Sequence, residues 1–123
     1  MPAITGRLST QQVATILNGA SQSGTIDLRD YAIAAIVMPA GWDAAAITFL
    51  ASATAGGTFA AVYDDAGTEV SITSVNAVAG RVIVNKTILE QLAGLRFVKI
   101  RSGVAATPVN QTADRSITVM LKS

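Results

Sequence analysis

The chain has 123 residues, enough for a single domain, and contains neither cysteine nor histidine. It therefore lacks the thiolate and imidazole groups on which most nucleophilic, general-base and zinc sites depend, which argues against an enzyme. Charged residues make up 14% of the sequence, well below the roughly 25% of an average globular domain, so a partner is expected to cover much of the surface. The net charge of +1 predicts no general affinity for nucleic acid.

Residues 1–24 are expected to form an N-terminal arm or a short helix. The segment Ser9–Leu17 fits a short helix and equally an arm that adds to a neighbouring chain. From residue 25 onward, apolar and polar residues alternate with a period of two, which is typical of β-strands. The expected strands are residues 25–29, 31–38, 45–52, 58–63, 69–73, 81–85, 96–102 and 115–122.

Two segments between these strands have their own local signals. The sequence Asp64-Asp65-Ala66-Gly67 predicts a hairpin turn, because Asp starts turns and Gly accepts a positive φ. Thr87, Glu90 and Gly94 have the spacing of a capping box and a C-terminal glycine, which predicts a short helical turn. The uncharged run 44–63 is long enough for a membrane span, but two short strands and a turn explain it better, so no membrane span is expected.

These elements predict an all-β protein: an antiparallel β-sandwich, jelly-roll-like, with a short helical turn before the penultimate strand. The sandwich should occupy residues 25–123, and the chain should form one domain overall. Its expected core contains residues from three strands: Phe49, Val98, Ile100, Ile117 and Val119.

The charges are unevenly distributed along the chain. Residues 1–80 hold two basic and six acidic residues, whereas residues 81–123 hold seven basic and two acidic ones. One interpretation is that the two halves interleave in a single fold and neutralise each other. The alternative is a polar molecule that packs head to tail against copies of itself.

Three carboxylates, from Asp64, Asp65 and Glu69, cluster around the predicted hairpin and could hold Ca²⁺ through oxygen ligands. Their spacing does not match the EF-hand pattern. A solvated hairpin tip is the favoured interpretation, and no metal or cofactor is expected.

Trp42, the only tryptophan, lies in a turn after Pro39. There it could stack on a sugar ring or contribute to an interface. We favour the third possibility, that it closes one end of the sandwich. Phe97, Lys99 and Arg101 share one strand face, which is expected to be solvated or to form salt bridges with a neighbouring subunit.

The segment 102–113 is long, polar and stiffened by Pro108. Its amide side chains, Asn110 and Gln111, could bond the backbone of another subunit. Arg101 and Arg115 would then flank the loop and pair with Asp64 and Asp65 of another copy. The alternative is a loop that packs on its own sandwich. The candidate interface residues are Trp42, Asp64, Asp65, Arg101, Asn110, Gln111 and Arg115.

Three stretches, GGTFAAVYDDAGTEVSI, LAGLRFVKIRSG and ATPVNQTADRSITVML, resemble small β-sandwich virion proteins of tailed bacteriophages and prophages. The resemblance covers about residues 25–122. Such proteins are capsid decoration proteins, head fibres or tail-associated modules. The strands LRFVKIRSG and RSITVMLK also resemble the closing strands of discoidin-like carbohydrate-binding jelly rolls, although an aromatic content of 5% departs from the binding members.

The resemblance implies a non-enzymatic virion structural protein, most simply a decoration (cement) protein on the capsid exterior. It would bridge major capsid subunits, as a trimer or another closed homo-oligomer. The alternative is a carbohydrate-binding module of a head or tail fibre that recognises host glycan.

Overall fold

A computed structural model describes residues 9–84 and 91–122, and all regular structure in these residues is β-strand. None of the described segments is an apolar helix that could cross a membrane. The strands are β1 (Ser9–Ile16), β2 (Ile26–Asp27), β3 (Ala32–Val37), β4 (Ile47–Ser52), β5 (Ala60–Ala61), β6 (Ser71–Ile72), β7 (Val82–Ile83), β8 (Phe97–Val104), β9 (Thr107–Pro108) and β10 (Arg115–Lys122).

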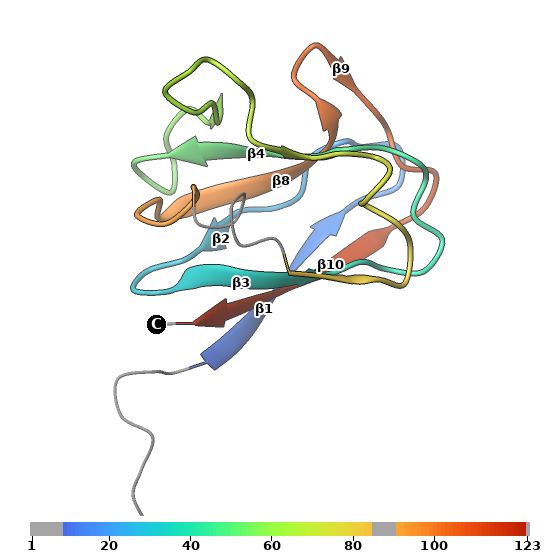
Figure 1. Cartoon of the computed structure of the whole chain (residues 1–123), viewed down its shortest axis with the longest axis horizontal. Coiled ribbons are helices and arrows are strands. Elements are labelled where there is room, and N and C mark those ends of the chain that lie inside the picture. The colour runs from blue at the N-terminus through green and yellow to red at the C-terminus, as the bar shows by residue number, and fades with distance from the viewer. Residues whose placement is uncertain (1–8, 85–90, 123) are drawn as a thin grey trace, which may run out of the picture.

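The strands form two antiparallel sheets packed face to face (Figure 1). Sheet A has the order β1-β10-β3-β7, and sheet B has the order β2-β8-β4-β5, with β6 pairing with β4 on the same side as β5. If β5 and β6 count as one interrupted strand, the pairings are nested: β1 with β10, β2 with β8, β3 with β7, and β4 with β5 and β6. This nesting is that of a jelly roll, so the predicted fold class is confirmed.

The core lies between the two sheets and takes side chains from both. The five expected core residues are all 0% exposed: Phe49, Val98, Ile100, Ile117 and Val119. They come from β4, β8 and β10, where fully buried apolar residues recur at every second position. Burial of apolar area at these alternating positions is the main force that fixes which face of each strand points inward.

The N-terminal segment differs from its prediction. Ser9–Ile16 is a strand, β1, and it pairs with β10 of the same chain over all eight residues. It is neither a short helix nor an arm detached from its own sandwich. Ala14 and Ile16 are buried in the core, and the side-chain amide of Gln12 donates to the backbone oxygen of Asp27 in β2 at 2.7 Å. The edge strands of the two sheets are thus linked, and β1 belongs to the sandwich.

The predicted short helical turn is not seen. Residues 87–90 lie outside the described residues, and residues 91–94 form a turn in which Leu95 N–H donates to the Leu92 oxygen at 3.2 Å. Leu92 is fully buried, so this segment covers the core without forming a helix. In β7, Ile83 points into the core while Val82 and Val84 are 56% and 74% exposed.

Candidate interaction surfaces

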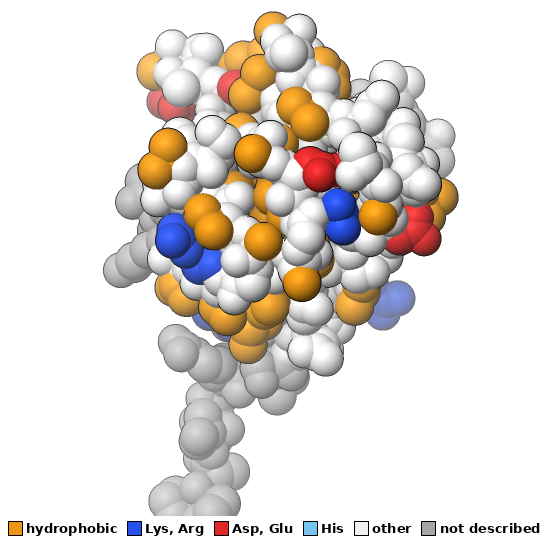
Figure 2. All heavy atoms as spheres, turned by 90° about the vertical axis from the view of Figure 1, so that its right-hand side faces the viewer, with side chains coloured by type: hydrophobic (Ala, Val, Ile, Leu, Met, Phe, Trp, Pro, Cys, Tyr) orange, Lys and Arg blue, Asp and Glu red, His pale blue; other side chains and the backbone are white. Residues whose placement is uncertain are grey.

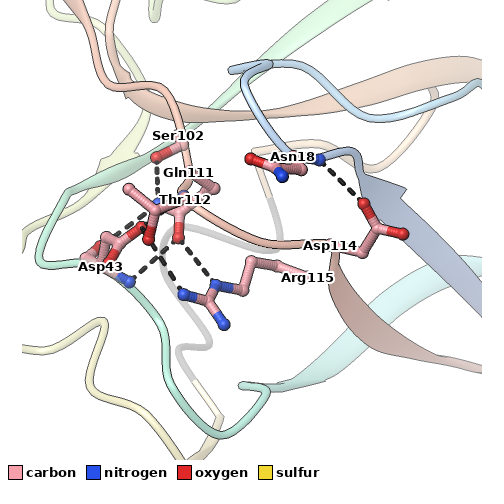
Figure 3. Close-up of polar contacts among 7 residues, drawn as sticks. All are labelled: Asn18, Asp43, Ser102, Gln111, Thr112, Asp114 and Arg115. Carbon is pink, nitrogen blue, oxygen red and sulfur yellow. Dashed lines mark hydrogen bonds and ion pairs between the residues drawn. The ribbon is translucent and has the colours of Figure 1, made fainter.

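Gln111 closes the loop 105–114 onto the rest of its own sandwich (Figure 3). Its side-chain oxygen accepts from Asp43 N–H at 2.9 Å, and its side-chain nitrogen donates to the Asp43 oxygen at 3.2 Å and to Ser102 Oγ at 2.8 Å. Its backbone also exchanges hydrogen bonds with Gly19 and Ala20. Gln111 is only 1% exposed, so the prediction that it bonds another subunit is wrong.

Asp43 and Arg115 complete this network. The Asp43 carboxylate accepts from the Thr112 backbone N–H at 2.7 Å and from the Thr112 hydroxyl at 2.9 Å, and it pairs with Arg115 at 3.6 Å. The Thr112 bonds, and secondarily the Arg115 charge, hold the pKa of Asp43 below its usual 3.8. Gly41 has φ +74°, which favours glycine, and the Arg115 guanidinium lies 2.9 Å from where a Cβ on this residue would stand. Arg115 is therefore already paired within its own chain.

A second contact holds the same loop from the other side. The Asp114 carboxylate accepts from Asn18 N–H at 2.8 Å (Figure 3). The loop is therefore bound at Gln111, Thr112 and Asp114, while Asn110 remains exposed. Of the two amide side chains predicted to contact another subunit, only that of Asn110 is available.

The two amides give a matched test of this arrangement. Gln111→Ala is expected to lower the free energy of unfolding by about 1–3 kcal/mol, because it leaves buried polar groups of Asp43 and Ser102 without partners. Asn110→Ala is expected to change it by less than about 0.5 kcal/mol, because the residue is exposed. Urea unfolding of both variants measures the difference. Equal losses for the two variants would contradict the assigned role of Gln111.

Arg101 is also internal. Its guanidinium is buried on the side of β8 that faces away from the core, where Nη2 pairs with the Glu69 carboxylate at 2.5 Å and Nε donates to Thr48 Oγ1 at 3.0 Å. The side chains of Arg101 and Glu69 are 6% and 14% exposed. Glu69 also accepts from Ala105 N–H at 3.1 Å. The predicted solvated or intersubunit role of Arg101 is therefore wrong.

The predicted hairpin at residues 64–67 is present, and hydrogen bonds within the turn account for the presence of Asp64. Asp64 Oδ1 accepts from Ala66 N–H and Thr68 N–H, each at 2.9 Å, and Gly67 has φ +84°. Asp65 is exposed at the tip, whereas Glu69 turns toward Arg101. Within the described ranges, no three Asp or Glu residues gather in a way that could hold a metal ion.

Trp42 belongs to the loop between β3 and β4, and this loop lies at the end of the sandwich that Figure 2 shows. Trp42 is 8% exposed, and its Nε1–H donates to the Ala45 oxygen at 3.3 Å. It is thus a core residue that neither a sugar nor a partner can reach directly. Charged side chains on this end are few and lie scattered among hydrophobic and uncharged polar ones (Figure 2).

The other aromatic side chains do not form a stacking platform. Phe59 and Phe97 are half-buried, with Lys99 Nζ 4.5 Å from the Phe59 ring centroid and the Arg96 guanidinium 4.9 Å from that of Phe97. Tyr63 is 53% exposed. A shallow hollow of about 460 Å³ lies near Phe97. None of its lining residues is aromatic or carries a carboxylate. They are Ala51, Ser52, Ala53, Gly94, Leu95 and Arg96.

The ion pairs show how the two oppositely charged halves of the chain combine. Three pairs join an acid from residues 1–80 to a base from residues 81–123: Asp27 with Arg96, Asp43 with Arg115, and Glu69 with Arg101. The Arg96 hydrogen bond and charge lower the pKa of Asp27. The halves therefore interleave and neutralise each other inside one fold, as the first interpretation predicted.

The outer face of sheet A is the surface with the fewest charges among the described strands. Its central row crosses all four strands, because Val13 pairs with Thr118, Thr118 with Val37, and Val37 with Val82. The neighbouring row contains Gln11, Met120 and Ala35, and on the other side Thr15 and Ser116 share a hydrogen bond of 3.1 Å.

The outer face of sheet A thus consists of the outward-pointing side chains of β1, β10, β3 and β7. Val13, Val82 and Met120 are 58%, 56% and 42% exposed. Lys122, at the end of β10, is the one charged side chain on this face within the described strands.

Comparisons with protein-family models, curated proteins and solved structures found no match for this chain.

Sequence reasoning missed this face for a specific reason. Its members come from four strands that are far apart in sequence, so no single stretch of the sequence displays the face. The available signal was the low overall charge, which indicated a covered surface without locating it.

Proposed function

We propose that this protein is a non-enzymatic structural protein of a bacteriophage particle, a decoration protein on the capsid exterior that bridges major capsid subunits. The observation that carries the proposal is the outer face of sheet A. It spans four strands, exposes Val13, Val82 and Met120, and bears a single charge at its margin. Uncharged surface of this extent on a small domain is typical of a face that a large partner covers.

The chemistry of the chain supports the same class of function. The chain has no histidine or cysteine, and among the described residues Asp43 and Glu69 are both engaged in structural ion pairs, which leaves them poorly suited to activate a nucleophile. The jelly roll is a fold used by viral capsid and lectin domains, which is support by analogy of fold alone. The small side chains of the outer face, Thr and Ala among them, allow close approach of a flat partner.

The direct test is to identify the protein in purified virions by mass spectrometry, and to mix the purified protein with shells that lack it. We expect saturable attachment that raises the temperature at which the shells come apart. Titration with host surface polysaccharide distinguishes a glycan-binding module. Saturable glycan binding together with absence from the virion would overturn the proposal.

One substitution tests the face itself. Met120→Glu is expected to weaken attachment to shells at least about tenfold, because it would bury a charge without a partner at the contact. Val75→Glu is the matched control, since Val75 is 79% exposed in a turn outside sheet A. Both variants should unfold at the temperature of the parent protein. Weaker attachment of Val75→Glu alone would place the contact elsewhere on the molecule.

A further inference from the structure

The four lateral edges of the two sheets are unequal. Sheet A ends in β1 and β7, and sheet B ends in β2 and in the interrupted strand β5–β6. Strands β2, β5, β6 and β7 have two residues each, whereas β1 has eight. Short edge strands are one of the devices that keep a sheet from pairing with another chain. Three edges of this sandwich use that device, and the β1 edge does not.

The β1 edge also lacks the other protective devices. Its sequence, STQQVATI, has no charged residue, proline or glycine. Its register with β10 is continuous over all eight residues, so no bulge twists the edge away. Ile16 forms a bridge with Ser23, which closes the C-terminal end. Among the described residues, nothing pairs with the outer side of Ser9–Thr15.

We propose that Ser9–Thr15 pairs with the same segment of a second copy, antiparallel about a two-fold axis. An edge of this kind is self-complementary, because antiparallel pairing about a two-fold axis is isologous. The absence of charge on β1 means that the two copies bring no like charges together. The axis lies near the middle of the segment, which brings Val13 close to its own copy.

The pairing has two structural consequences. Sheet A becomes one continuous eight-stranded sheet, because four strands from each copy join at β1. The outer face of sheet A then continues from one copy into the other as a single surface with little charge. The resulting assembly is a dimer on a two-fold axis, which is one of the closed homo-oligomers other than a trimer that the family resemblance allows. The inference stands apart from the proposed virion function, because it concerns the purified protein alone.

Sedimentation velocity of the purified chain tests the proposal with a matched pair of variants. Val13→Lys is expected to weaken dimerisation at least about tenfold, because it sets two like charges beside the axis. Val82→Lys makes the same chemical change at a similarly exposed position, 56% against 58%, on the opposite edge of sheet A. It should leave dimerisation unchanged. A parent chain that stays monomeric at every soluble concentration, or equal weakening by the two variants, would overturn the proposal.

Crosslinking gives an independent readout of the axis. The chain has no cysteine, so Gln11→Cys, Gln12→Cys and Val13→Cys each introduce a single thiol. Directly opposed residues of an antiparallel pair have Cβ atoms roughly 4.5–5.5 Å apart, close enough for a disulfide after small adjustment. We expect at least one of the three variants to crosslink rapidly on mild oxidation, and Val82→Cys not to. Crosslinking of Val82→Cys alone would place the contact at β7 and overturn the proposal.

Discussion

Arg101→Met is expected to lower the free energy of unfolding by about 3–5 kcal/mol, because it leaves a charge buried without its partner. The Glu69 carboxylate is 14% exposed and would keep only the Ala105 N–H as a donor. Thr48 Oγ1 would also lose the bond that it accepts from Arg101 Nε. Urea unfolding followed by circular dichroism measures the loss.

An exposed ion pair supplies the control for this variant. Arg29 pairs with Asp27 at 3.4 Å, but its side chain is 73% exposed, so Arg29→Met should cost no more than about 1 kcal/mol. The double variant Arg101→Met with Glu69→Gln should recover part of the loss, because it removes the unpaired charge. Equal, small losses for Arg101→Met and Arg29→Met would show that water solvates the Arg101 site.

Val98→Asp is expected to leave the chain insoluble or unfolded, because it places an unpaired carboxylate in the centre of the core at a cost of several kcal/mol. Val98 is 0% exposed and lies opposite Ile26 in β2 and Ala51 in β4. The amount of soluble protein and its circular dichroism spectrum report the outcome.

Val82→Asp makes the identical change on the outside of the sandwich. Val82 is 56% exposed in β7, so this variant should be soluble and normally folded. Soluble, folded Val98→Asp would contradict the inward direction of alternate β8 residues. Aggregation of Val82→Asp would show instead that β7 does not tolerate aspartate on either face.

The sequence predicted most of the sandwich because large apolar residues recur at every second position in the strands that build the core. In β8 and β10, Val98, Ile100, Ile117 and Val119 occupy every second position, and all are buried. Alternation alone does not say which of two apolar faces points inward. In β7, valines flank an isoleucine, and only Ile83 enters the core.

Strand β1 was not predicted because the alternation of apolar and polar residues in its sequence is weak. Its one valine points outward, while an inward position is held by Gln12, which donates a hydrogen bond across to Asp27. Such a segment has no clear apolar period of two, and only its tertiary partners determine that it is a strand.

Arg101, Gln111 and Arg115 were misjudged as interface residues for a different physical reason. Arginine and glutamine are mostly exposed in proteins, and they are buried where a partner compensates them. Those partners are distant in sequence: Glu69 is 32 residues from Arg101, and Asp43 is 68 residues from Gln111. Local sequence patterns cannot show which residues far apart in the sequence form such pairs. It succeeded at Asp64, whose partners lie two and four residues away.

The pairing of β1 with β10 makes the fold nearly circular. Ser9 lies opposite Lys122 in neighbouring antiparallel strands, so these two positions meet at one end of sheet A (Figure 1). A short linker between them would leave every pairing of the two sheets intact, and the chain could be opened instead at the exposed turn residue Ala106. Such a circular permutant would carry its new termini on the β8–β9 hairpin. The sandwich could then present a fused peptide away from both the β1 edge and the outer face of sheet A, and so serve as a scaffold for display.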